Sequence, residues 1–175
     1  LIVYNKLLKS MLKTGEPGII FSSNPDYICD SCACKQLKPN EELVLGHINL
    51  AKYYNNGTVD YKKMQQATKL LAEAMEKIDP NYSIGVVGYQ DLLNKLGLNY
   101  GSKEALSVLD KAIKIMKQNA KSIALAPSGT TSRLLRVCPS IEPNGLVSYL
   151  DELNTMMVVQ KQIDGQISKT INLKN

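Results

Sequence analysis

Residues 84–97, IGVVGYQDLLNKLG, join a short apolar run to a segment of helical periodicity that ends at a glycine. The run 84–87 has the length and the apolar character of a buried strand. Residues 89–96 are predicted to form a helix that stops at Gly97. Further strand candidates are the short apolar runs at 18–21, 43–48, 123–126 and 171–173. Because strands that are separated by helices imply an α/β arrangement, we predict a helix-rich α/β fold.

The longer helices have clear start and stop signals. Residues 60–78 place their apolar side chains on one helical stripe, and Asp60 is a suitable N-cap. A second long helix is predicted after Ser102, its candidate N-cap, and continues toward position 123. Shorter helices are predicted over 2–12 and over most of the tail from 146 to 167.

The composition is that of an ordinary globular protein. At 175 residues the chain is expected to form a single domain, 1–175. Its 21 basic and 16 acidic residues give a net charge of +5, and no arginine-rich run accompanies the lysines, so we expect no direct nucleic-acid contact. No apolar run reaches the ~18 residues of a membrane span. Lysines interrupt the N-terminal apolar residues, and we therefore expect a cytoplasmic protein without membrane contact.

Three of the four cysteines, Cys29, Cys32 and Cys34, form a C-x2-C-x-C cluster. His47 and Cys138 are candidate fourth ligands for a zinc ion. A structural zinc site usually shows a second ligand pair at matching spacing, which this sequence lacks, so we predict no metal site. The alternatives are reduced thiols without a role and thiols used in redox or radical chemistry.

Residues 126–133, APSGTTSR, place small hydroxyl residues and a glycine directly after a short apolar strand candidate. Backbone N–H groups and hydroxyls of such a loop can converge on phosphate oxygens, above all where residues 134–136 begin a helix. The loop lacks the lysine and the spacing of a Walker A motif, and an ordinary Ser/Thr-rich turn is the alternative.

Taken in order, six motifs resemble the large, catalytic subunit of ribonucleotide reductase, most closely its adenosylcobalamin-dependent class. In the family the similar elements are GEPG, LGSINL, GVMG with LGIxY, APTGTIS, G/S-IEP and the helix and strand that follow. The matching segments here are TGEPGIIF (14–21), LGHINLAKY with NGTVDY (45–53, 56–61), IGVVGYQDLL with LGLNY (84–93, 96–100), APSGTTS (126–132), SIEP (140–143) and QIDGQISKTINL (162–173).

The resemblance implies part of the family's α/β barrel, which is built around a finger loop that carries a cysteine. It implies an oxidoreductase that reduces ribonucleotides to deoxyribonucleotides by thiyl-radical chemistry, as DNA replication requires. The implied ligand is a ribonucleoside diphosphate or triphosphate, the implied cofactor is adenosylcobalamin, and other reductase chains are possible partners that complete the barrel. The residues expected to bind the substrate phosphates are Ser128, Gly129, Thr130, Thr131 and Ser132.

The resemblance also assigns roles to the cysteine cluster. An ungapped count back from Leu45 places Cys32 at the family's radical cysteine, in its Asn-Pro-Cys-Gly-Glu motif. The same register places Asp30 at the substrate-binding Asn and Cys34 at the catalytic Glu, while the redox partner cysteine falls on Leu43. A thiol is mostly protonated at neutral pH and is a weak donor, so it replaces a carboxylate poorly.

These departures lead to two expectations. Ribonucleotide reduction by this chain alone is expected to be incomplete, and the alternative function is a catalytically inactive, reductase-derived nucleotide-binding or interaction module. Cys32 is expected to face residues 128–132 across a cavity wide enough for a ribose, within contact distance of its target.

Overall fold

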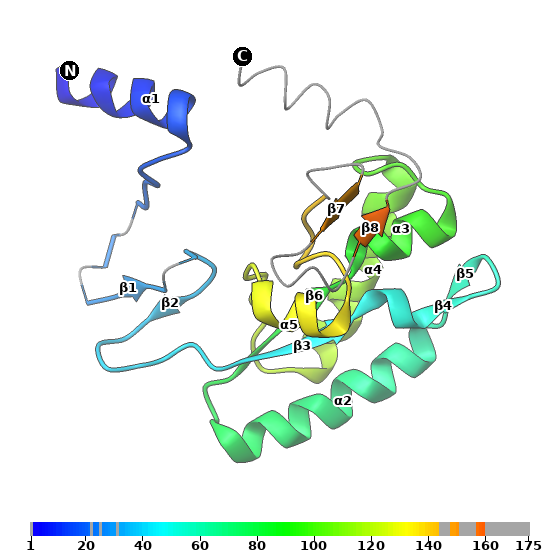
Figure 1. Cartoon of the computed structure of the whole chain (residues 1–175). Helices are drawn as coiled ribbons and strands as arrows, with labels where there is room; N and C mark the ends of the chain where they lie inside the picture. Colours follow the sequence, from blue (N-terminus) through cyan, green and yellow to red (C-terminus); the bar gives the residue numbers. More distant parts are fainter. Residues whose placement is uncertain are drawn as a thin grey trace.

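Two parallel strands, β3 (Leu45–Asn49) and β6 (Ser83–Val87), form the centre of the fold (Figure 1). The protein is represented by a computed structural model that describes residues 2–21, 23–24, 26–30, 32–143, 148–150 and 157–159. The two strands pair in register, from Leu45 opposite Ser83 to Asn49 opposite Val87. All five residues of β6 are buried, as expected for a parallel strand that is covered on both faces.

A third parallel segment lies beside β6. Ile84 forms an isolated parallel bridge with Ile123, in which the Ile84 amide donates to the Ser122 carbonyl (2.9 Å) and the Ala124 amide donates to the Ile84 carbonyl (3.2 Å). The strand candidates at 43–48 and 84–87 are therefore confirmed, and the candidate at 123–126 is present as a single bridge.

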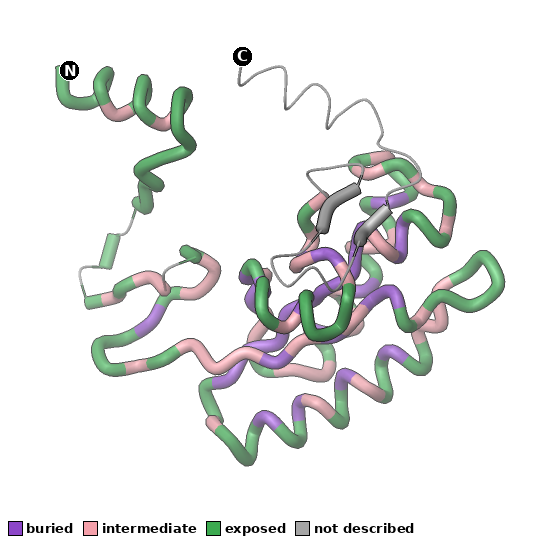
Figure 2. The backbone as a smooth tube through the Cα atoms, viewed as in Figure 1, coloured by how far each residue is buried: buried purple, intermediate pink, exposed green. Residues whose placement is uncertain are grey.

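Helices α2 (Tyr61–Ile78) and α4 (Lys103–Asn119) supply most of the core, together with α3 (Tyr89–Leu96). A Cβ atom at Gly46 would lie 3.2 Å from the Met75 side chain, so the face of the sheet with Gly46 approaches α2 closely. The buried residues gather around β3 and β6, as the purple segments of Figure 2 show. The fully buried members are Leu50, Met64, Ile84, Val86, Tyr89, Leu92, Leu93, Ala105, Ala112 and Met116.

The opposite face of the sheet carries polar residues. A Cβ atom at Gly85 would lie 3.3 Å from the His47 ring, so His47 and Gly85 share one face. Since side chains alternate along a strand, Asn49 lies on this face as well. We call the face that carries His47, Asn49 and Gly85 the polar face.

The predicted helix boundaries are confirmed where a capping residue marks them. The Asp60 side chain accepts a hydrogen bond from the Lys63 amide at 2.9 Å, and the Ser102 side chain accepts one from the Ala105 amide at 3.1 Å. Gly97 ends α3 with a φ of 68°, a left-handed conformation that favours glycine. Helix α1 (Ile2–Thr14) also forms as predicted, but none of its residues is buried.

Short elements connect these parts. They are β1 (Ile28–Cys29) paired with β2 (Gln36–Leu37), the 3-10 helix η1 (Leu50–Tyr53), β4 (Tyr54–Asn55) paired with β5 (Thr58–Val59), α5 (Gly129–Leu135), and β7 (Ser148–Leu150) paired with β8 (Met157–Val159). Figure 1 shows α1 and the β1–β2 hairpin to one side of the central strands.

Two predictions of secondary structure need correction. Residues 18–21 form no strand, and the Phe21 side chain is 89% exposed because no partner strand receives it. The helix expected over 146–167 is wrong at β7 and β8, which form an antiparallel pair. The rest of that tail and the strand candidate at 171–173 lie outside the described residues.

The sheets of the described segments are all two-stranded, and these segments contain no closed barrel. The observed mixture of helices and small sheets is compatible with the predicted α/β class. That the chain forms part of a reductase barrel, as a single domain over 1–175, stays a prediction. Within the described ranges, no helix combines the length and the apolar character needed to cross a membrane.

Candidate functional site

Residues 28–37 form a short hairpin, β1–β2 with its loop, that contains the cysteine cluster; we call it the thiol hairpin. The Asp30 carboxylate organises its loop. One carboxylate oxygen accepts hydrogen bonds from the Cys32 amide (3.0 Å) and the Cys34 thiol (3.2 Å), and the other accepts one from the Lys35 amide (2.7 Å). Aspartate favours such local bonds to the backbone, which explains how the sequence closes this loop.

These contacts set the proton affinities of the loop. Partial burial raises the pKa of Asp30, but the hydrogen bonds from the Lys35 and Cys32 amides and from the Cys34 thiol outweigh it, so that pKa lies below its usual range. Burial, the hydrogen bond to Asp30 and its negative charge together raise the pKa of Cys34 to about 11. At neutral pH, Asp30 is therefore a carboxylate whose oxygens already accept hydrogen bonds from its own loop. Cys34 is a neutral thiol at this pH.

Cys32 is exposed and lines a cavity of about 440 Å³. The other lining residues are Ala33 and Cys34 of the hairpin, Ile113 and Lys117 of α4, and Ile123 and Leu125 of the third parallel segment. The Lys35 ammonium donates to the Asn81 carbonyl, just before β6, and so attaches the hairpin to the body of the protein.

The structure thus brings Asp30, Cys32 and Cys34 together in one loop. None of the five phosphate candidates, residues 128–132, lines the cavity of Cys32. The expectation that Cys32 faces those residues across a ribose-sized space has no support in this cavity, and it stays a prediction.

The candidate fourth ligands for zinc, His47 and Cys138, do not form a metal site with the cysteine cluster. His47 lies on the polar face, and Cys138 is buried beside α3, where its sulfur accepts a hydrogen bond from the Gln90 amide at 3.1 Å. Across the described ranges there is no group of three or more His, Cys, Asp or Glu residues able to hold a metal ion. Burial raises the pKa of Cys138 to about 12, with the charge of Asp91 as a second cause, so this thiol is protonated at neutral pH.

The phosphate candidates lie at the start of a helix, whereas the sequence suggested a loop. Helix α5 begins at Gly129, so Ser128 is its N-cap and the next four residues form its first turn. The Ser128 side chain makes no capping hydrogen bond, and its buried hydroxyl has no partner. The first amides of a helix lack intrahelical partners, which leaves the Gly129, Thr130 and Thr131 N–H groups available to an acceptor. The Ser132 hydroxyl donates to the Gly129 carbonyl at 3.0 Å.

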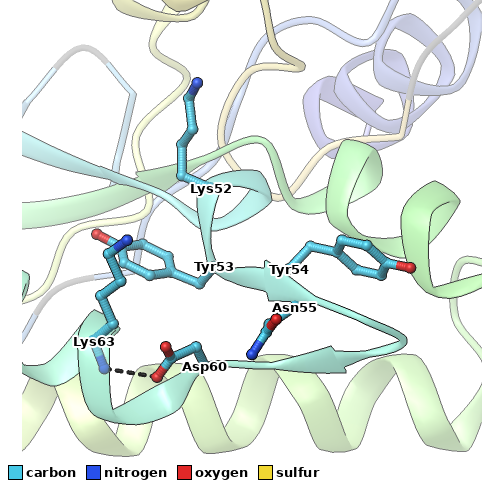
Figure 3. Close-up of a pocket in the computed structure, with 6 residues that line it drawn as sticks. All are labelled: Lys52, Tyr53, Tyr54, Asn55, Asp60 and Lys63. Carbon is cyan, nitrogen blue, oxygen red and sulfur yellow. Dashed lines mark hydrogen bonds between the residues drawn. The ribbon is translucent and has the colours of Figure 1, made fainter.

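A second cavity, of about 220 Å³, lies where η1, the β4–β5 hairpin and the start of α2 meet. Its lining consists of Lys52, Tyr53, Tyr54, Asn55, Asp60 and Lys63. Figure 3 shows the Tyr53 and Tyr54 rings pointing in opposite directions, and Lys52 pointing away from Asp60. The side chains therefore do not converge on one ligand. Sequence reasoning missed this cavity: Lys52, Tyr53 and Asp60 lie in the motifs 45–53 and 56–61, but neither motif indicates a cavity.

Sequence reasoning also missed a set of buried polar groups, namely His47, Asn49, Gln90 and Ser140, which with Ser128 lack a hydrogen-bond partner for one side-chain atom each. The only sequence signal is the polar alternation of His47 and Asn49 within the strand. Burial lowers the pKa of His47, so its imidazole is neutral at pH 7.

No protein-family model matches the chain. Among curated proteins, the vitamin B12-dependent ribonucleoside-diphosphate reductase of Thermoplasma acidophilum is 22% identical in an alignment that includes 99% of this chain and 33% of that protein. The reductase of the same name from Mycobacterium tuberculosis is 25% identical over 85% of this chain and 28% of its own length. Ribonucleoside-diphosphate reductase subunit alpha of Chlamydia pneumoniae is 26% identical over 66% of this chain and 14% of that protein.

The chain spans a third or less of the length of these relatives. The alignment with the Thermoplasma enzyme, 257 residues, is longer than this chain, so it includes positions that have no counterpart here. The shared coverage agrees with the six motifs, which also run through nearly the whole sequence. The chain is thus similar, at low identity and over most of its length, to proteins named as ribonucleoside-diphosphate reductases.

Proposed function

We propose that this chain is a ribonucleotide reductase catalytic-subunit-like protein that binds a ribonucleotide. Reduction of that ribonucleotide requires additional polypeptide. The observation that carries the proposal is the order of the six motifs, and it is supported by relatives named as reductases that align with 66% to 99% of the chain. The ligand is a ribonucleoside diphosphate or triphosphate. The Thermoplasma relative is named for the diphosphate.

In this proposal, the phosphates rest on Ser128, Gly129, Thr130, Thr131 and Ser132. The geometry favours such a role, since the first turn of α5 offers amides that no side chain caps. A Cβ atom at Gly129 would meet no atom within 4 Å, so the space beside these amides is open.

Cys32 is the proposed radical site, whose sulfur would abstract a hydrogen atom from the ribose. Such chemistry also needs an acid for the departing 2′-hydroxyl and a dithiol that supplies two electrons. Cys34, with its pKa raised to about 11, is too weak an acid for the first task. The chain alone is therefore not expected to complete the reaction, and other reductase chains are the proposed partners.

Adenosylcobalamin is the proposed cofactor of the completed enzyme, because two of the three relatives described above are named as vitamin B12-dependent. When bound, this cofactor supplies the radical. The described residues around Cys32 do not form a site for all of it, since a cavity of about 440 Å³ is of the size that holds a drug-sized ligand. The rest of the cofactor site would have to come from additional polypeptide.

A second candidate function is a catalytically inactive, reductase-derived nucleotide-binding or interaction module. Two observations favour it: the Asp30 carboxylate is occupied by its own loop, and none of the phosphate candidates lines the cavity of Cys32. The two functions share the nucleotide site and differ in turnover.

Calorimetric titration with a ribonucleoside diphosphate tests the shared site. The double variant Gly129→Val, Thr130→Ala covers the first-turn amides and removes a hydroxyl, so it is expected to weaken binding strongly. Gly18→Val is the matched control, because position 18 is also free of atoms within 4 Å of its Cβ position and lies outside the site. Unchanged affinity in the double variant would contradict the phosphate site. Turnover of the wild-type chain with adenosylcobalamin and a dithiol would contradict its expected inactivity.

A further inference from the structure

The cavity beside the thiol hairpin combines an apolar wall with a single charged side chain. Ile113, Ile123 and Leu125 form the wall, and Lys117 of α4 is the charged residue among those that line it. The volume of about 440 Å³ lies in the range of pockets that hold small organic ligands. A ligand that matches this lining therefore has an apolar part and a negative charge.

Cys32 and Cys34 add two thiols to the same lining. The structure describes all four cysteines of the chain, and among them Cys32 is the exposed one. Cys29 and Cys34 are half-buried, and Cys138 is buried. Because the reaction of a thiol with a molecule from solution depends on access, Cys32 is the cysteine that such a molecule reaches most readily.

The Asp30 carboxylate makes the two thiols of the cavity unequal. One of its oxygens accepts from the Cys32 backbone amide at 3.0 Å and from the Cys34 thiol at 3.2 Å. Burial, this hydrogen bond and the charge of Asp30 raise the pKa of Cys34 to about 11. Since the thiolate is the nucleophilic form of a cysteine, Cys34 is a poor nucleophile at neutral pH.

The protonated neighbour also protects an adduct on Cys32. A mixed disulfide is resolved when a second thiolate attacks it. Cys34 is protonated, and a disulfide between residues so close in sequence seldom meets the required geometry. Cys29 does not line the cavity. A mixed disulfide on Cys32 should therefore persist until an external thiol reduces it.

The charges around the cavity favour an anionic ligand. Asp30 does not line the cavity, and its two oxygens already accept three hydrogen bonds from their own loop. Within the described part of the chain Lys117 forms no ion pair, whereas Lys114, one turn earlier on α4, pairs with Asp110 at 2.7 Å. The Lys117 ammonium is therefore available to a carboxylate.

We propose that Cys32 forms a mixed disulfide with a small disulfide that carries carboxylate groups, and that Lys117 binds one of these carboxylates. The Cys32 thiolate attacks one sulfur of the small disulfide, so that a bond to the Cys32 sulfur forms and the original S–S bond breaks. The other half leaves as a thiolate with the electron pair, and it takes up a proton from solvent in place of the one that Cys32 released. Cys32 is oxidised, and the small disulfide, which is the oxidant, is reduced.

The adduct is a reversible block of the Cys32 sulfur. This regulatory meaning rests on the proposed function, because the modified sulfur is the one proposed to carry the radical. Formation of the adduct does not rest on it, since the exchange needs neither a ribonucleotide nor adenosylcobalamin. The two proposals can therefore fail separately.

The test compares two disulfides on the purified chain, which is first reduced and then freed of reductant. Oxidised glutathione carries carboxylates, and hydroxyethyl disulfide is uncharged. Mass spectrometry of the intact chain gives the rate of each reaction, and peptide mapping identifies the modified cysteine. We expect one glutathione adduct per chain, on Cys32, and we expect it to remain after the excess disulfide is removed.

Lys117→Gln tests the contact with the carboxylate. The ratio of the glutathione rate to the hydroxyethyl rate should fall about two- to fivefold, the effect of losing one exposed ion pair. Lys114→Gln is the matched control, because it removes the same charge from the same helix outside the cavity lining, and it should keep the wild-type ratio. Lys117→Arg retains the charge and should also keep it. A ratio within one variant cancels any change in the exposure of the thiol.

Asp30→Asn tests the inequality of the two thiols. It removes the charge that helps to keep Cys34 protonated, so Cys34 should be modified faster than in the wild type. An unchanged rate at Cys34 would overturn the protective role of Asp30.

The remaining outcomes are distinct. The same rate ratio in Lys117→Gln and in the wild type would overturn the contact with the carboxylate. Absence of an adduct on the wild-type chain, or modification of Cys29 or Cys34 as fast as that of Cys32, would overturn the site. Neither result would affect the proposed nucleotide binding, which the calorimetric titration measures independently.

Discussion

Replacing Gly85 by alanine probes how closely the third parallel segment approaches β6. The added Cβ would lie 2.6 Å from the Ala124 carbonyl oxygen and 3.3 Å from the His47 ring. The Ala124 carbonyl is backbone and cannot rotate away, and the neighbouring bonds of Ile84 to Ser122 and Ala124 fix the separation of the strands. Overpacking of this kind costs about 1–3 kcal/mol, which would lower the melting temperature of a chain of this size by about 2–4 °C per kcal/mol.

Urea unfolding followed by circular dichroism measures this loss, with two glycines as graded controls. At Gly46 the nearest atoms are 3.2–3.3 Å away and belong to the flexible side chains of Met75 and Leu71, so Gly46→Ala should cost less than Gly85→Ala. At Gly18 no atom lies within 4 Å, and Gly18→Ala should change stability by no more than about 0.5 kcal/mol. If Gly85→Ala is as stable as Gly18→Ala, the third segment does not lie against β6, and the placement of Ser128 at its end fails with it.

Two further substitutions test the local hydrogen bonds. Asp60→Ala removes the side-chain cap of α2 and should lower the free energy of unfolding by about 1 kcal/mol in the same urea assay. A variant with unchanged stability would show that the cap is not formed in solution. Asp30→Asn removes a negative charge that helps to raise the pKa of Cys34. The pH midpoint of Cys34 alkylation, measured by peptide mass spectrometry, should therefore move down from about 11. Burial should still keep this midpoint above that of an ordinary thiol. An unchanged midpoint would mean that burial alone sets this pKa.

The sequence alone predicted helices α1 to α4 and the family resemblance. Asp60, Ser102 and Gly97 predicted helix ends correctly because a cap acts within about four residues of itself. The alternation of short apolar runs and helices predicted the α/β class for the same reason, since periodicity is a local property. The order of the motifs identified the relatives that the comparison then found.

Local reasoning failed where pairing or burial depends on distant residues. The run 18–21 has the composition of a strand, but a strand needs a partner, and the described chain supplies none for it. The sequence suggested a loop at 126–133 and did not predict α5, because hydroxyl residues after a strand are as typical of a loop as of a first helical turn.

The candidate site was decided by the tertiary structure. The sequence determined that Asp30, Cys32 and Cys34 are neighbours, because a five-residue span keeps them together. It did not determine that α4 and the third parallel segment close the cavity around Cys32. Nor did it indicate that Asn49 and Gln90 would carry unpaired polar atoms at the ends of two strands. Both depend on contacts between residues forty or more positions apart, such as the Gln90 amide with the Cys138 sulfur, and only the packing of the whole chain determines such contacts.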